Sequence, residues 1–533
     1  MHQSSEGREM TAMEHMSPRS RLAGRIGTVL LIVVSVAPFA GLHNFVHFSA
    51  PGGTGFIQYD MPYYVANGRE VFERGNGLTY PNPYDTDPNA PPVYFHWLLW
   101  LLGFGVTKLH LDPGLLLVAA GVMGALGCAW LTLSIVEVLS ADRRYVKLLF
   151  LMAMWGAGVV CLGQAAINVL NGREPWLMLL RLDPTYWFTS WGRNAIYPTE
   201  AIYHLLVAGS WLAAFRGRWK LSLAWAAVVA ATHPFSGLAQ LLIQFTWSSI
   251  RLIQLRQRDA LRYWLGATAC LAAFAGYYAL YLPSIPQHQA IQRSWSLDWS
   301  IGAKSMIAAW GMVGVLAAAR LWKDRNRLSV NEFFLIVCWA VSFLLVIHDR
   351  FMKPIQPLHF TRGYVWFPLF LLALPLIQLG FAYVRRHAGP VALSCAVTLA
   401  LGIASADNIA LFVITAQKPR DGFYLSTSER AVFEWAEQSK LDGVLLCEST
   451  ELCYLSATYT AMRPLVGHMY NTPAFEERVR RTAEWFEGRG SGPWFSDIDL
   501  ILAGRDQPMP LLDRLEWEVA YENQDLVLLR RRP

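Results

Sequence analysis

Apolar stretches of about 20 residues recur between Leu22 and Val413, and they restrict the possible folds of this chain more than any other feature. Each stretch is long enough to cross the hydrocarbon core of a bilayer as a helix. Only 16% of the 533 residues are charged, against about 25% in an average soluble domain, while 54% are hydrophobic. The pattern predicts a polytopic α-helical membrane protein, followed by a tail of ordinary soluble composition.

Basic residues cluster in the short connections after every second apolar stretch. These clusters account for the net charge of +6, so the charge does not indicate nucleic-acid binding. Short cytoplasmic loops are enriched in Lys and Arg, so we expect the N-terminus inside and the tail outside the cytoplasmic (inner) membrane. Eleven spans are predicted: Ala23–Leu42, Pro113–Leu139, Leu148–Leu162, Pro198–Phe215, Leu221–Thr232, a sixth ending at Ile253, Tyr263–Leu282, Ile301–Leu321, Phe333–Ile347, Tyr364–Val384 and Pro390–Val413.

This topology divides the chain into three predicted parts. Residues 1–22 form a cytoplasmic N-terminal tail, and residues 23–413 form a transmembrane domain with external loops at 43–112 and 163–197. The first of these loops contains a short apolar helix, Val93–Val106, which we expect to lie in the membrane interface. Residues 414–533 form an extracytoplasmic α/β domain.

Alternating helix and strand patterns in the tail indicate the α/β class. A Ser and a Glu three residues apart predict a capping box that starts a helix. A disulfide between Cys447 and Cys453 is possible, because an extracytoplasmic location permits disulfides. The predicted elements are the capping box Ser426–Glu429, a strand at Gly443–Glu448, a helix at Thr472–Glu487, a strand at Ile498–Ala503 and a hairpin of Trp517–Tyr521 with Leu526–Leu529.

The strongest candidate for chemistry is Asp60, which follows the first span on the external side. Its neighbours Tyr59, Tyr63 and Tyr64 can flank a sugar ring. A carboxylate near the bilayer surface can accept a proton from a hydroxyl group. The alternative is that Asp60 only starts the helix predicted at Pro62–Glu73, and both roles are compatible.

Three further ionisable residues lie near the external ends of predicted spans. Asp183 lies among aromatic residues, although an Asp-Pro pair is also a common turn. Glu200 starts the span at Pro198, where the helix dipole favours an acid. His233 ends a short span. An ionisable group at membrane depth is energetically costly, so its presence there suggests a function. Its alternative role is to bond a backbone group freed by Pro234.

Basic residues gather before the tenth predicted span. His359 and Arg362 belong to the motif that opens this span, and Lys353 and Arg350 lie nearby. A guanidinium can hold a phosphate through two parallel hydrogen bonds. The alternative for Arg362 is an interfacial arginine that contacts lipid headgroups.

Several motifs are absent from the sequence. It contains no GxxxxGK[ST], no GxGxxG after a strand, no HExxH and no GxSxG. ATP coupling, cytosolic nucleotide-sugar binding, zinc proteolysis and α/β-hydrolase chemistry lose support. A transporter or flippase of lipid-linked sugars remains an alternative, although no internal repeat is visible. A non-catalytic membrane protein with an external ligand-binding domain is another.

The order of these features resembles the GT-C superfamily of membrane glycosyltransferases. That superfamily includes protein O-mannosyltransferases and bacterial lipid A aminoarabinose transferases. The resemblance covers the architecture of most of the chain. It rests on Gln58–Tyr64 after the first span, the Pro-initiated stretch 91–103, and the Arg-containing His359–Tyr364.

The resemblance implies transfer from a polyprenyl-phosphate-linked sugar donor, because nucleotide sugars are not normally available outside the membrane. Asp60 is then the base, Arg362 with Lys353 or Arg350 holds the phosphate, and Asp183 and His233 position the acceptor. Asp60, Asp183 and His233 also permit a divalent metal ion without requiring one. One base implies inversion at the anomeric carbon, and the acceptor remains open between a glycan, a lipid and a protein.

Overall fold

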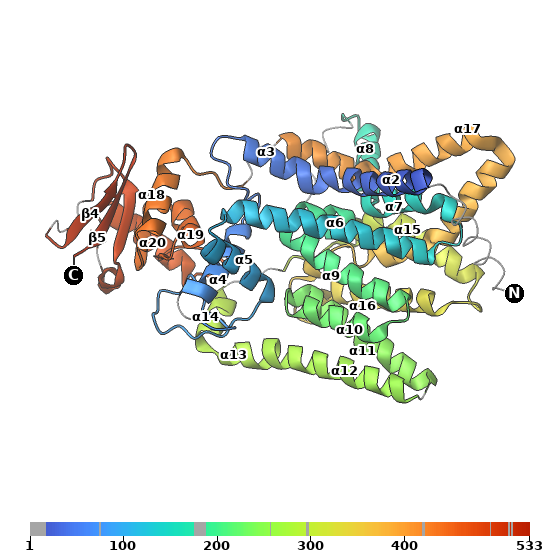
Figure 1. Cartoon of the computed structure of the whole chain (residues 1–533), viewed down its shortest axis with the longest axis horizontal. Helices are drawn as coiled ribbons and strands as arrows, with labels where there is room; N and C mark the ends of the chain where they lie inside the picture. Colours follow the sequence, from blue (N-terminus) through green and yellow to red (C-terminus); the bar gives the residue numbers. More distant parts are fainter. Residues whose placement is uncertain are drawn as a thin grey trace.

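The helices of the protein run along one long body, and a small sheet lies at one end of it (Figure 1). The computed structural model describes residues 18–73, 76–174, 188–255, 257–294, 298–417, 422–490, 492–509, 512 and 515–532. In Figure 1 the sheet lies at the end opposite to the bend of α17. The C-terminal region, defined here as residues 422–532, therefore caps the helical body at one end.

Long apolar helices form this body. The long helix α17 changes direction at Gly389, whose φ of 81° lies outside the helical range. Glycine adopts such a φ readily because it has no Cβ. The helices of the body are α2 (Pro18–Val36), α6 (Pro113–Leu139), α9 (Pro198–Phe215), α10 (Trp219–Ala230), α11 (Pro234–Leu255), α12 (Arg258–Ala275), α15 (Ala303–Lys323), α16 (Val330–Val346) and α17 (Trp366–Gln417).

Within the described ranges, five helices are long and apolar enough to cross a membrane, or six if a bent pair counts as one span. The predicted number of eleven is therefore not confirmed. Helices α10 and α16 are shorter than this test requires, α9 and α11 do not pass it, and the tenth and eleventh predicted spans both belong to α17. The coarser prediction, a mostly helical protein with several long apolar helices, is confirmed.

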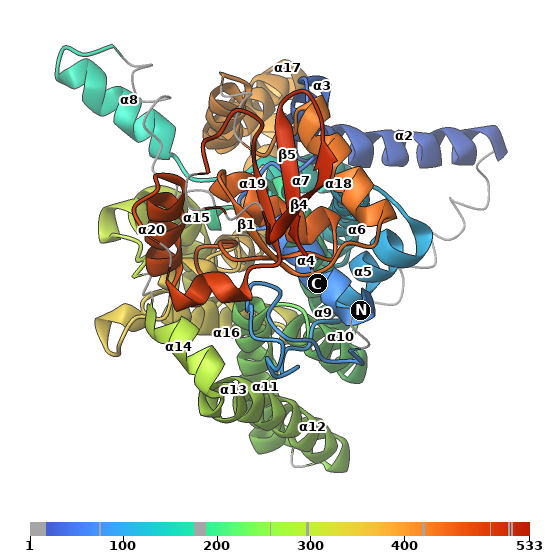
Figure 2. The same ribbon diagram turned by 90° about the vertical axis from the view of Figure 1, so that its left-hand side faces the viewer.

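The third predicted span, Leu148–Leu162, is wrong as a continuous helix. Helix α7 (Val146–Trp155) ends there, and α8 (Val160–Leu170) leaves it at an angle of 65°. Asp407 of α17 accepts hydrogen bonds from the backbone nitrogens of Val160 and Cys161, at 3.1 and 2.8 Å. These bonds satisfy amides at the start of α8, which would otherwise lack acceptors. Figure 2 shows α8 projecting from the body.

The C-terminal region contains a five-stranded mixed sheet in the order β2-β1-β3-β5-β4. Strands β2, β1 and β3 are parallel, and β5 is antiparallel to both β3 and β4. The predicted capping box at Ser426 is confirmed, whereas α19 and β2 were not predicted. The elements are α18 (Thr427–Gln438), β1 (Val444–Cys447), α19 (Thr450–Tyr459), β2 (Arg463–Pro464), α20 (Phe475–Phe486), β3 (Leu500–Gly504), β4 (Trp517–Glu522) and β5 (Leu526–Arg531).

Two short helices of the first loop, α4 (Met61–Glu73) and α5 (Trp97–Leu109), lie between the C-terminal region and the body, where α4 packs against α19 and both pack against α6. They pack closely through glycines, since a Cβ on Gly103 would lie 2.0 Å from the Gly68 carbonyl oxygen. Beyond the body helices, short helices α3 (His43–Ser49), α13 (Leu282–Ser284) and α14 (Pro286–Ser294) complete the connections.

Ion pairs fix α4 against the C-terminal region. Arg69 lies 2.6 Å from Glu437, and Arg463 lies 3.5 Å from Glu70. Arg69, Glu70 and Arg463 are buried, whereas the Glu437 side chain is 38% exposed. The segment that carries Asp60 leads directly into α4 and therefore lies next to this junction.

Candidate active site

Asp60 immediately precedes α4 and ends a segment that pairs with the C-terminal region. Phe423 donates its backbone hydrogen to the Phe56 oxygen at 2.9 Å, and Leu425 donates to the Gly52 oxygen at 2.8 Å. This backbone pairing positions residues 52–56 against a segment that lies more than 360 residues later in the sequence. Two segments that lie far apart in the sequence therefore position Asp60, the base predicted from sequence.

The carboxylate of Asp60 contacts a histidine from the C-terminal region. Its Oδ1 lies 2.9 Å from Nε2 of His468, 408 residues away in sequence. The His468 side chain is 3% exposed, and that of Asp60 is 44% exposed. One oxygen of the carboxylate is therefore engaged by a buried partner, while the side chain remains partly exposed to solvent.

Tyrosines surround this pair. The ring of Tyr59 lies 4.8 Å from the His468 ring, and the ring of Tyr63 lies 5.0 Å from it. The hydroxyl of Tyr454 in α19 donates to the Tyr59 backbone oxygen at 2.6 Å and accepts from the Tyr63 nitrogen at 3.1 Å. Burial raises the pKa of Tyr59 to about 12, so its hydroxyl stays protonated at neutral pH. We call Asp60, His468 and these tyrosines the Asp60 cluster.

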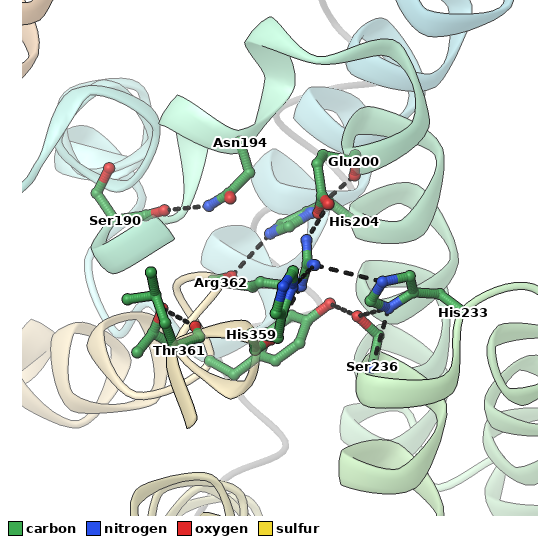
Figure 3. A network of polar contacts seen from close by, with 11 residues as sticks. Ser190, Asn194, Glu200, His204, His233, Ser236, His359, Thr361 and Arg362 are labelled. Atoms are coloured by element: carbon green, nitrogen blue, oxygen red, sulfur yellow. Dashed lines mark hydrogen bonds and ion pairs between the residues drawn. The ribbon is translucent and has the colours of Figure 1, made fainter. Parts of the chain in front are cut away.

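A second polar group, the Arg362 cluster, forms around the predicted phosphate-binding arginine (Figure 3). Its guanidinium forms an ion pair with Glu200, donates through Nη2 to Nδ1 of His359, and lies 3.3 Å from Nε2 of His233. Its Nε donates to the His359 backbone oxygen at 2.9 Å. His204 lies 2.8 Å from the Arg362 backbone oxygen and fixes the loop.

Burial controls the charge states of this second cluster. The Arg362 side chain is 2% exposed, and burial lowers its pKa to about 10, so it remains charged at neutral pH. Burial lowers the pKa of His359 to about 4, so this imidazole is neutral and can accept from Arg362. A buried charge has to be paired, and the Glu200 carboxylate supplies the counter-charge.

Tyr64 connects the two clusters electrostatically. Burial raises the pKa of its hydroxyl; the Asp60 charge adds to the increase, and the Arg362 charge opposes it. The Asp60 charge also acts on Arg362 and His359. Eight of the predicted site residues lie in or beside these two clusters: Asp60, Tyr59, Tyr63, Tyr64, Glu200, His233, His359 and Arg362.

Other predicted site residues do not join these clusters. Lys353 is exposed, and Arg350 lies 3.7 Å from its neighbour Asp349. The neighbours of Arg362 are instead two histidines and a glutamate. Asp183 lies outside the described residues.

A metal trio of Asp60, Asp183 and His233 stays a prediction. Asp60 and His233 lie in separate clusters, and the described residues contain no group of three His, Cys, Asp or Glu side chains suited to a metal ion. A metal ion bound to Asp60 would have His468 as its neighbouring ligand, and it would replace the hydrogen bond between Asp60 and His468.

Sequence reasoning missed His468. No motif marks it, because its role depends on a contact across 408 residues. One signal was available: His468 follows β2, and the carboxyl ends of parallel strands commonly carry functional groups. The two tail cysteines, Cys447 and Cys453, are buried free thiols.

No family model and no curated protein sequence matches this chain. Among the solved structures that are similar to it are those of two proteins. ArnT from Cupriavidus metallidurans in the apo state has 12% identity and a TM-score of 0.46, over 95% of this chain and 98% of that one. Its form bound to undecaprenyl phosphate has 11% identity and a TM-score of 0.48, over 96% and 98%.

The second protein is the Archaeoglobus fulgidus oligosaccharyltransferase tethered with an acceptor peptide. It has 11% identity and a TM-score of 0.49, over 90% of this chain and 69% of that one. With identities of 11–12% and TM-scores below 0.5, these likenesses carry no step of the chemistry below, which depends on the side chains of this chain. Both solved proteins are GT-C enzymes, the group that the sequence resembles.

Proposed function

We propose that this protein is a membrane glycosyltransferase that moves a sugar from a polyprenyl-phosphate-linked donor to an acceptor hydroxyl on the extracytoplasmic side. One observation carries the proposal: a half-exposed carboxylate, Asp60, is held in place by the buried His468 among tyrosines, and its charge acts on the buried cation Arg362. A base and a cation at one site match the two charges that develop when a hydroxyl displaces a phosphate.

In this mechanism Asp60 accepts the proton of the acceptor hydroxyl. The acceptor oxygen forms a bond to the anomeric carbon as the bond from that carbon to the phosphate oxygen breaks. The electron pair of the broken bond leaves with the polyprenyl phosphate. Because the leaving phosphate is a weak base, the step needs no strong general acid, unlike glycoside hydrolysis with its two carboxylates. Single displacement inverts the anomeric carbon.

Arg362 supplies positive charge toward the leaving phosphate in this proposal. Its contacts in the structure use most of its N–H groups, and Glu200 offsets its charge. Arg362 therefore acts as a fixed, oriented cation behind the site. His233 and His359 orient the guanidinium.

The proposed topology has eleven spans, the N-terminus inside the inner membrane and residues 414–533 outside as a separate domain. Basic clusters at one end of the predicted spans support it. The C-terminal region at the opposite end of the body from the bend in α17 supports it as well (Figure 1). Membrane lipids surround the body, and the acceptor is a glycan, a lipid or a protein.

Asp60→Asn tests the proposal in purified protein assayed against a panel of polyprenyl-phosphate hexoses and pentoses. General-base catalysis contributes about 10²–10⁴-fold, so transfer falls by that factor. Asp112→Asn is the matched control, because Asp112 caps α6 through its side chain and asparagine also caps helices. Full transfer by the Asp60 variant sinks the assignment of the base.

A further inference from the structure

We propose that His468 is a positioning residue for Asp60 and makes the C-terminal region part of the active site. The inference rests on the proposed role of Asp60 as the base. His468 Nε2 lies 2.9 Å from Asp60 Oδ1, and the imidazole is 3% exposed while the carboxylate is 44% exposed. The histidine is buried behind the carboxylate and does not face the substrate side.

The hydrogen bonds of the ring determine which nitrogen carries the proton. Nδ1 of His468 accepts from the backbone nitrogen of Tyr470 at 3.2 Å. A backbone N–H can only donate, so Nδ1 has no proton in the neutral ring. The amide nitrogen of Asn471 lies 2.9 Å from the same Nδ1 and donates to it as well. The proton therefore resides on Nε2, which donates to the Asp60 carboxylate.

Packing fixes the orientation of this donor. The His468 ring lies between the aromatic rings of Tyr59, Tyr63 and Tyr454, at centroid distances of 4.8, 5.0 and 5.6 Å. The Tyr59 hydroxyl accepts from the Met469 backbone nitrogen at 2.8 Å, which holds the same loop. The imidazole cannot rotate away from Asp60 without breaking these contacts.

The consequence for the base concerns its two oxygens. Oδ1 is engaged by His468, so Oδ2 is the oxygen that the acceptor hydroxyl can approach. A base has to lie within hydrogen-bond reach of the proton that it accepts, and misplaced catalytic groups lose much of the rate. His468 sets the direction of the carboxylate, and the turn after β2 transmits the position of the C-terminal region to the reaction.

Two variants separate the donor from the ring. His468→Phe keeps an aromatic ring among the tyrosines and removes the Nε2–H donor. His468→Gln loses the ring but places an amide N–H near the position of Nε2. Hydrogen bonds to charged groups contribute enough for His468→Phe to lower kcat about 10–100-fold while the KM of the acceptor changes by less than about threefold. His468→Gln retains kcat within about fivefold of the unmodified protein.

A purely structural role gives the opposite order. The variants would then lose activity in parallel with their thermal unfolding temperatures, and His468→Gln would be the worse of the two. That result, or full activity of His468→Phe, overturns the proposal and leaves Asp60 as the base. If instead Asp60→Asn retains transfer, the proposed function fails. His468→Phe made in the Asp60→Asn background has no further effect on the residual rate, because the histidine acts through the carboxylate.

The tautomer gives a readout that needs no substrate. Histidine-labelled protein in detergent is compared with His468→Phe by nuclear magnetic resonance, which assigns the His468 signals by difference. The expected neutral ring carries its proton on Nε2. A proton on Nδ1 overturns the proposal whatever the activity data show.

Discussion

The Asp60 cluster and the Arg362 cluster contain similar residue types, but they hold charges of opposite sign at different degrees of burial. Asp60 is 44% exposed and is held by a neutral donor, His468. Arg362 is 2% exposed and is neutralised by Glu200, with histidines on its other nitrogens. The Asp60 carboxylate is accessible to solvent, and its proposed role as a base depends on its orientation. The Arg362 guanidinium is buried, and its burial depends on the counter-charge of Glu200.

In the proposed function, this difference divides the work of the site between a base and a cation. A base has to meet a substrate proton, so its carboxylate must be accessible. A cation that stabilises developing negative charge can remain fixed behind the site, where low polarity strengthens its field. The Asp60 cluster should therefore respond to mutation mainly in rate, and the Arg362 cluster mainly in stability.

The largest expected effect tests the Arg362 cluster. Glu200→Gln leaves Arg362 as a buried charge without its counter-ion, and breaking such a pair costs about 3–5 kcal/mol of unfolding free energy. Asp60→Asn keeps a side-chain oxygen that can accept from His468, so we expect it to cost less than about 1 kcal/mol. Equilibrium unfolding in detergent measures both. Equal losses would remove the distinction between the two clusters.

The next effect tests whether Arg362 also serves catalysis. Arg362→Lys keeps the charge but cannot hold Glu200, His359 and His233 through one planar fork. We expect kcat/KM for the donor to fall about 10–100-fold, the cost of one strong charge-assisted contact. The KM of the acceptor stays unchanged. A loss confined to the acceptor would place Arg362 away from the phosphate.

The pH dependence of stability gives a smaller effect. His359 has an ordinary pKa of 6.5, which burial lowers to about 4. Between these values the unfolded chain binds more protons, so the contribution of His359 to stability is complete above about pH 6.5 and is lost as the pH falls toward 4.

In His359→Gln the slope of unfolding free energy against pH should therefore be shallower, by up to about 1.4 kcal/mol per pH unit. Unfolding curves at several pH values between 4 and 7 measure this slope for both proteins. An unchanged slope would mean that His359 titrates in the folded protein as it does in the unfolded chain.

The smallest effect concerns the connection between the C-terminal region and the first loop. Tyr454→Phe removes the hydroxyl that joins α19 to the backbone of Tyr59 and Tyr63, and we expect a loss of about 1 kcal/mol. Arg480→Ala, which breaks exposed pairs on α20, is the control and costs less than about 0.5 kcal/mol. Thermal unfolding compares the two, and equal shifts would show that the Tyr454 hydroxyl contributes little.

Much of the local structure followed from sequence patterns. Two predicted spans, Pro113–Leu139 and Pro198–Phe215, have the same bounds as α6 and α9. The strand predicted at Gly443–Glu448 contains β1, and the two predicted hairpin strands lie within β4 and β5. These features depend on hydropathy, prolines and caps within a few residues, which a single sequence records directly.

The break between α7 and α8 could not be predicted in this way, because it depends on Asp407 from a helix about 250 residues later. Glu200 and Arg362 were recognised separately as candidates, but their pairing across 162 residues was not. Hydropathy gives the depth of such residues and does not give their partners.

The sequence by itself determined that the chain forms long apolar helices and carries one carboxylate among tyrosines after the first of them. These are local properties, fixed by composition and by residues close in the chain. Only the tertiary structure decided that His468 orients this carboxylate and that Glu200 neutralises Arg362. Hydrogen bonds and ion pairs of this kind act over about 3 Å in space, and chain folding alone brings residues 408 positions apart to that distance.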